Sequence, residues 1–243
     1  MATSKKQFHE GEVLVEGIMD AIGKKVMNVN DRLNNGSLFS ERIQTWKLYD
    51  LPTDTYIKKA DVLHDERQSE NDLKVYHMAS LKPRVSYIDI KYIKPQSVLT
   101  VNKYKVICGR ILHANSNVVT SIKILKPGEV CNESYGVLAV TDTLDEAMTI
   151  GKYVLTKFFR FMCLYKIGKG TNGWSASRFT MVPDIAIDKN GQDISSNMSN
   201  GNGVKIDWSK TIDQIDEQLY KKYNLTDDEK EYIKGKIDYY TKK

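Results

Sequence analysis

The spacing of apolar residues changes period along this chain of 243 residues, and this change constrains the fold most strongly. From Glu12 to Asn34, apolar residues recur at steps of three and four, which predicts an amphipathic helix. Alternating β-branched and aromatic residues then predict strands over 84–90, 104–112 and 134–141, and a shorter one at 73–76. Helical spacing returns after residue 143, so we expect a mixed α+β fold with an irregular mixed sheet and packed helices.

The clearest helix signal opens the C-terminal part of the chain. Thr143 and Glu146 have the spacing of a capping box, and an apolar face follows as far as Tyr165. We therefore predict one long amphipathic helix over 143–165, with Phe158, Phe159 and Met162 facing the core.

The remainder of the chain alternates between low and high order. Residues 185–206 are rich in Asn, Gly and Ser with little to bury, which predicts a flexible surface loop. A helical tail follows, with one helix over 212–223 and a second that begins at the Thr226 capping box. We divide the chain into an N-terminal part, 1–130, and a C-terminal part, 131–243. The residues at 40–46 also suggest a short helix.

Composition and charge limit the classes of protein. No run of 18 apolar residues exists, and the polar N-terminus lacks the apolar region of a secretory signal. The cysteines, Cys108, Cys131 and Cys163, are not in CxxC spacing, so we expect reduced thiols and a cytoplasmic protein. A net charge of +5 permits contact with nucleic acid without requiring it.

The usual catalytic motifs are missing. The sequence has no GxxxxGK[ST] loop, no GxGxxG after a predicted strand, and no Asn/Asp-Pro-Pro-Tyr tetrapeptide. Its four histidines are far apart and lack Cys or Glu at the spacing of zinc ligands. We therefore expect no metal, no cofactor and no catalysis by this chain alone.

One catalytic alternative stays open. Asp72 precedes the sequence Asp89-Ile90-Lys91 by an interval typical of metal-dependent nucleases, in which carboxylates bind Mg²⁺ and a lysine helps to activate water. Asp-x-Lys arises often by chance in a chain with 28% charged residues, and the competing and favoured interpretation is that Asp89 and Lys91 form the solvent face of an alternating strand.

Basic and amide side chains interleave with aromatic ones from residue 82 onward, as in proteins that contact phosphates and base edges. For Lys157 and Arg160, a structural ion pair is the competing interpretation, and the Gly-rich loop at 168–175 also fits an ordinary solvated loop. The candidate DNA-binding residues are Lys82, Arg84, Lys91, Lys94, Arg110, Lys123, Lys126, Lys157, Arg160, Lys166, Lys169, Asn172 and Arg178.

The order of several segments resembles the C-terminal target-recognition domain of bacterial type II and IIG restriction–modification enzymes with adenine methyltransferase activity. The stretch at 156–161, Thr-Lys-Phe-Phe-Arg-Phe, is the most specific part of this resemblance. Further stretches that carry it lie at 128–135, 142–147, 182–184, 207–210 and 219–226.

The resemblance implies recognition of a specific double-stranded DNA sequence, with Mg²⁺ and S-adenosylmethionine used only by a partner methyltransferase or nuclease. Residues 190–204 interrupt a joint that is compact in the family, and no catalytic domain precedes Met1. The chain is then a separate specificity subunit, a shortened relative or one domain of a longer protein. A protein-interaction module that docks on or inhibits a DNA-processing enzyme is the remaining hypothesis.

Overall fold

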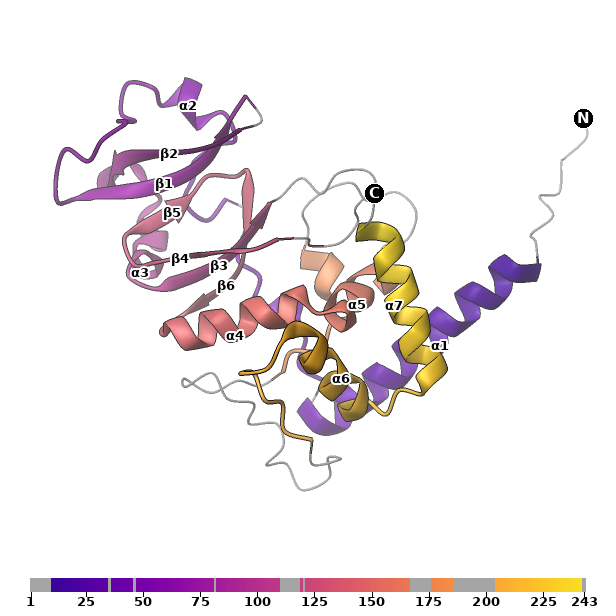
Figure 1. Ribbon diagram of the computed structural model, residues 1–243. Coiled ribbons are helices and arrows are strands. Elements are labelled where there is room, and N and C mark those ends of the chain that lie inside the picture. Colours follow the sequence, from indigo (N-terminus) through magenta and orange to yellow (C-terminus); the bar gives the residue numbers. More distant parts are fainter. Residues whose placement is uncertain are drawn as a thin grey trace, which may run out of the picture.

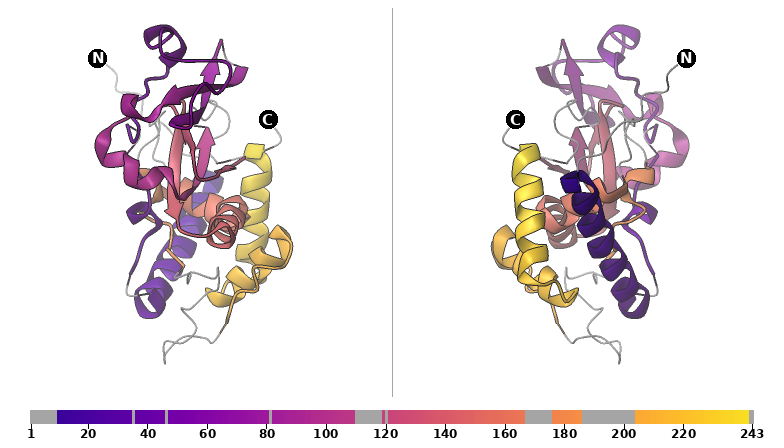
Figure 2. Two further views of the ribbon diagram at one scale, coloured as in Figure 1. Left: turned by 90° about the vertical axis from the view of Figure 1, so that its left-hand side faces the viewer. Right: turned by 90° about the vertical axis from the view of Figure 1, so that its right-hand side faces the viewer.

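The computed structural model of the chain describes residues 10–34, 36–45, 47–80, 82–109, 119, 121–166, 176–185 and 204–241. It has a mixed α+β architecture, as predicted. Two small sheets lie at one end of the molecule and helices gather at the other (Figure 1). In both views of Figure 2 the first sheet lies near the top and helix α6 (Ile212–Lys222) near the bottom.

The described strands form two three-stranded sheets rather than the single irregular sheet that we predicted. In the first sheet, β1 (Asp72–Ala79) pairs antiparallel with β2 (Lys82–Asp89) and parallel with β5 (Glu129–Cys131). In the second, β3 (Tyr104–Gly109) lies between β4 (Lys123–Leu125) and β6 (Tyr135–Thr141), antiparallel to both. The expected division of the chain after residue 130 therefore falls inside β5.

The second sheet is buried on both faces, and so it separates two hydrophobic cores. Val106 and Leu138 belong to the larger core, which the helices cover. Ile107 and Val137 belong to a smaller core that is shared with the first sheet. The ladder between β3 and β6 is irregular between Val106 and Ile107, where the register shifts.

The helical part is built around α5 (Lys157–Lys166), which contacts α1 (Glu10–Asn34), α4 (Leu144–Leu155), α6 and α7 (Asp227–Thr241) (Figure 1). The α1 helix confirms the prediction for 12–34, and the α6 and α7 helices confirm the helical tail. At the start of α7, the Thr226 N–H donates to Glu229 and the Glu229 N–H donates to Thr226 Oγ1, which confirms this capping box.

The prediction of one helix over 143–165 is wrong, because the chain breaks at Thr156 into α4 and α5. Thr156 has extended backbone angles, φ −64° and ψ 151°. The carboxylate of Asp216 on α6 accepts hydrogen bonds from the N–H groups of Lys157 (2.9 Å) and Phe158 (2.8 Å). Since the free N–H groups at the new helix start find a partner, the break leaves no donor without an acceptor there. Phe158, Phe159 and Met162 are buried in the core, as predicted, whereas Leu144 and Met148 at the start of the predicted helix are exposed.

Two smaller predictions also need correction. Residues 39–41 form only a 3₁₀ turn, η1 (Phe39–Glu41), in place of a short helix over 40–46. At the edges of the predicted surface loop, Ile185 and Ile206 are both buried in the larger core. Residues 186–203, which make up most of that loop, lie outside the described residues.

The central strand β3 carries a fully buried cation, Lys105. Its ammonium donates hydrogen bonds to the carbonyls of Val101 (2.9 Å) and Thr100 (3.3 Å). These carbonyls belong to the last residues of α3 (Val98–Val101), where the helix dipole favours a positive charge. Burial lowers the pKa of Lys105 from 10.5 to about 8.

Replacement of Asp216 by Asn should change how stability depends on pH. Burial raises the pKa of Asp216 from 3.8 to about 6, although the N–H groups of Phe158 and Lys157 oppose the shift. Between these values the folded protein holds a proton that the unfolded chain has lost, so the free energy of unfolding falls as pH rises. Asp216→Asn removes this pH dependence. The free energy of unfolding of the variant, relative to that of the wild type, should therefore rise by about 3 kcal/mol from pH 4 to pH 7. Denaturant unfolding at several pH values measures it, with the exposed Asp213→Asn as control.

Lys105→Met should produce the opposite dependence at alkaline pH. Between about pH 8 and 10.5 the folded protein holds fewer protons than the unfolded chain, so the free energy of unfolding rises with pH. The variant lacks this rise. Its free energy of unfolding should therefore fall by about 3 kcal/mol relative to that of the wild type across the window. Chemical denaturation of the variant and of a matched Lys103→Met control from pH 7 to 10 tests this. Parallel curves for wild type and Lys105→Met would contradict it.

Candidate nucleic-acid interface

The distribution of charge along the chain is uneven. From Ile90 to Gly128 the sequence contains no Asp or Glu. Seven cationic residues lie in this stretch: Lys91, Lys94, Lys103, Lys105, Arg110, Lys123 and Lys126. Of these, Arg110 is outside the described residues, Lys105 is buried and Lys103 is half-buried, while the others are exposed. The absence of acids, more than the number of cations, marks this stretch as attractive to anions.

Short elements bring part of this stretch together on one surface. The chain passes from β2 through η2 (Ile90–Tyr92) and η3 (Pro95–Ser97) into α3. The turn before β5 joins the same surface, because the Gly128 N–H donates to the Val101 carbonyl (3.0 Å). Gly128 has φ of 79°, in the left-handed region that glycine adopts without strain. We call the exposed side chains of residues 91–99, together with Lys126, the α3 surface.

The α3 surface is anchored to the segment at 48–49 beneath it. Ser97 Oγ donates to the Leu48 carbonyl, and the hydroxyls of Tyr49 and Thr100 lie 3.0 Å apart in a hydrogen bond. The Lys94 N–H also donates to the Tyr49 carbonyl (3.4 Å). The backbone that carries these lysines is therefore held in place by several tertiary hydrogen bonds.

Cations without an acidic partner occur on this surface and on β2. Among the described residues, Lys94, Lys126, Lys82 and Arg84 are exposed and form no ion pair, whereas Lys91 lies 3.5 Å from Asp89 and Lys103 lies 2.9 Å from Asp142. Lys82 and Arg84 point to the same face of β2, because they are two residues apart.

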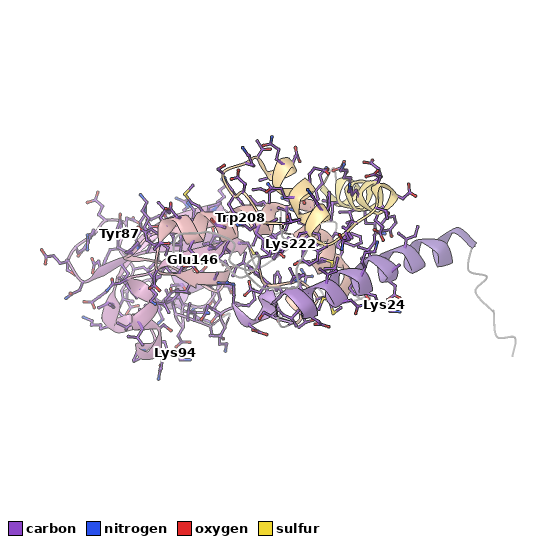
Figure 3. All side chains as sticks on the ribbon, turned by 90° about the horizontal axis from the view of Figure 1, so that it is seen from below. Lys24, Tyr87, Lys94, Glu146, Trp208 and Lys222 are labelled. Atoms are coloured by element: carbon purple, nitrogen blue, oxygen red, sulfur yellow. The ribbon has the colours of Figure 1, made fainter. Side chains whose placement is uncertain are left out.

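Several described cations of the helical part are paired instead. Lys24 lies 2.7 Å from Asp20, and Lys234 lies 3.2 Å from Glu217. Lys25 and Lys230 pair with Glu229 and Asp227, both at 2.7–2.8 Å. Figure 3 shows Lys94 and Lys24 toward opposite ends of the molecule. The two-sheet end thus presents cations that remain available to an external anion.

Lys123 contacts an aromatic ring between the two sheets. Its ammonium lies 4.5 Å from the centre of the Tyr76 ring, and that of Lys74 lies 5.1 Å from it. The Tyr76 hydroxyl donates to Glu129 Oε1 (3.2 Å), which also lies 3.4 Å from the Lys74 ammonium. Lys123 is exposed, but this cluster partly satisfies its charge.

The structure removes Arg178 from the predicted set of DNA-binding residues. Only 5% of Arg178 is exposed, and burial lowers the pKa of its guanidinium, although the nearby thiols of Cys163 and Cys108 oppose this shift. A guanidinium in the protein interior cannot reach a phosphate, so this assignment is corrected to a structural one.

The other predicted residues from the helical part are occupied locally or lie outside the described residues. Lys157 pairs with Asp238 (3.2 Å), which favours the structural ion pair over a phosphate contact. Arg160 is half-buried, and its buried Nε has no hydrogen-bond partner. The side chain of Lys166, and residues Lys169 and Asn172, are not among those described.

The β1–β2 hairpin places Asp72 directly opposite Asp89, so the two carboxylates of the nuclease alternative do come together. Both have structural roles. Asp72 is buried and accepts hydrogen bonds from Gln68 N (2.7 Å), Ser69 N (3.0 Å) and Ser69 Oγ (2.9 Å), and these donors lower its pKa. Asp89 accepts from the Lys91 N–H (2.9 Å) and begins η2.

A cleft of about 540 Å³ lies beside Asp72. Its charged lining is mixed in sign, with Arg67 and Lys74 on one hand and Glu70, Asp72 and Glu129 on the other. Within the described part of the chain, no group of three His, Cys, Asp or Glu side chains is placed to hold a metal ion. The cleft therefore selects neither an anion nor a cation by charge alone.

Comparison with known proteins returned no matching family model, no matching curated protein and no matching solved structure. Across the described helices, none has both the length and the apolar character that a bilayer span requires.

The structural assignment of Arg178 makes a direct prediction. Arg178→Ala should lower the free energy of unfolding by about 2–4 kcal/mol, because it removes a large buried side chain and opens a void in the interior. The matched variant Arg84→Ala, at an exposed site, should stay within about 0.5 kcal/mol of wild type. Urea denaturation of both proteins measures the difference. Equal stability of the two variants would show that Arg178 is not a structural residue.

Proposed function

We propose that the chain recognises a specific sequence in double-stranded DNA as the specificity subunit or domain of a restriction–modification system. The observation that carries this proposal is the set of exposed cations without acidic partners on the α3 surface and β2, within a part of the chain almost free of acids. Such cations gain free energy by replacing the counterions that surround DNA phosphates. The resemblance of several segments to target-recognition domains is the reason that we assign this binding to a restriction–modification system.

In this proposal the chain positions itself by phosphate contacts and leaves the chemistry to its partner. Lys94, Lys126, Lys82 and Arg84 contact the backbone, while amide side chains such as Gln96 and Asn102, both exposed, are suited to base edges. A methyltransferase or nuclease partner in the cytoplasm supplies S-adenosylmethionine and Mg²⁺ chemistry.

The second candidate is a Mg²⁺-dependent nuclease, favoured by the opposition of Asp72 and Asp89 in the hairpin. Plasmid cleavage with Mg²⁺, abolished by EDTA and by Asp89→Ala, would support it. The hydrogen bonds that occupy Asp72 weigh against it, since metal binding requires a carboxylate free to coordinate. A docking or inhibitory module would bind a DNA enzyme from a nuclease-treated lysate and show no affinity for duplex.

Removal of four cations should lower the salt dependence of DNA binding. Each phosphate contact contributes about 0.9 to the slope of log K against log salt, so Lys82→Gln, Arg84→Gln, Lys94→Gln and Lys126→Gln together should reduce the magnitude of the slope by about 3.6. Fluorescence anisotropy with a labelled duplex between 50 and 200 mM salt, conditions that span the useful range for such contacts, measures it.

The matched control removes the same charge from the helical part, by Lys24→Gln, Lys210→Gln, Lys221→Gln and Lys236→Gln. This variant should keep the wild-type slope, because only net charge has changed. Selection from a pool of random duplexes should then enrich one motif with the wild-type chain. Equal slopes for both variants, or no enriched motif, would contradict the proposal.

A further inference from the structure

Leu99 is exposed to an unusual degree for a large apolar residue. It is 81% exposed, more than any other large hydrophobic residue described, and the half-exposed Val98 and Tyr92 belong to the same α3 surface. Single exposed leucines are common, whereas exposed apolar side chains that share one surface with polar neighbours are typical of a binding site. Because Val101, two residues further along α3, is buried, Leu99 points outward from a helix whose opposite side is fixed.

The support under Leu99 is stiff. The hydrogen bonds of Ser97 and Thr100 hold α3 from the segment at 48–49, and the buried Lys105 ammonium binds the carbonyls of Thr100 and Val101. A side chain on such a support keeps its exposed position at little further cost in conformational entropy when it enters a partner.

The surroundings of Leu99 select a polyanion as that partner. Lys94 and Lys126 are exposed and unpaired, and Lys91 lies on the same surface. The chain from residue 90 to residue 128 contributes no carboxylate to repel phosphates. Proteins that kink DNA combine such features, since an apolar side chain enters between base pairs while cations on the same surface hold the backbone.

We propose that Leu99 inserts between adjacent base pairs of the bound duplex from the minor groove and kinks it. This inference rests on the proposed function, and it adds that recognition depends on how easily the target bends. The site reads flexible steps, such as pyrimidine–purine steps, at the position where Leu99 enters.

The experiment uses the full chain and a duplex that carries 2-aminopurine at the central step and a fluorescent donor and acceptor at its ends. Binding of the wild-type chain should raise 2-aminopurine fluorescence and shorten the distance between the ends. Leu99→Ser should bind about tenfold more weakly, keep the wild-type salt slope, and lose both signals. Leu99→Phe should restore them, because it is again a large apolar side chain.

Met148→Ser on α4, another exposed apolar position, serves as the matched control and should behave as wild type. The inference is overturned if the wild-type chain binds duplex without either signal, or if Leu99→Ser kinks DNA normally. If the wild-type chain binds no duplex at all, the proposed function fails with it. Leu99-dependent binding to anionic phospholipid vesicles, without DNA distortion, would assign the surface to a membrane and also overturn the inference.

Discussion

The burial of β3 on both faces is the constraint on which the rest of the structure depends. Val106 is part of the core under the helices and Ile107 is part of the core under the first sheet, so one strand belongs to both. A strand in this position has no solvent side, and its near-continuous apolar sequence follows from that. Loss of packing on either face of β3 therefore affects both halves of the molecule.

The buried Lys105 connects this central strand to the candidate interface. Its stem lies in the core, whereas its ammonium binds the last carbonyls of α3, the helix that carries Leu99. Burial of an isolated ammonium is unfavourable, as its lowered pKa indicates, and a well-packed apolar residue would avoid that cost. We interpret Lys105 as a group that lowers the free energy of unfolding but fixes the position of α3 relative to β3.

The spacing of apolar residues predicted the long helices and strands. The features that it did not predict depend on contacts between residues far apart in the sequence. The helix over 10–34 and the strands β2, β3 and β6 each show a full period of apolar spacing, so their type followed from sequence. The break at Thr156 could not be predicted in this way, since the acceptor that stabilises it, Asp216, lies 59 residues from Lys157 along the chain. Elements of three or four residues, among them α3 and β5, are too short to show a period.

At the candidate site, the sequence likewise does not show which cations are buried, paired or exposed. Sequence identifies Arg178, Lys157 and Lys94 equally as cations, but the fold buries the first, pairs the second and leaves the third exposed. The absence of acids from 90 to 128 was the available signal that separates these groups, because cations in such a stretch have no local carboxylate to pair with.

Exposed ion pairs contribute little to stability, so the pairing of cations in the helical part is better understood as an effect on the surface potential. In the proposed function, the unpaired cations at the two-sheet end attract phosphates over about a Debye length, whereas a lysine paired with a carboxylate adds little to the potential that DNA meets. Under that proposal, an approaching duplex is oriented before contact, with its backbone toward the α3 surface. Leu99, the most exposed large apolar residue among those described, lies on that same surface, so the electrostatic and the hydrophobic observations on which the two proposals rest coincide in one place.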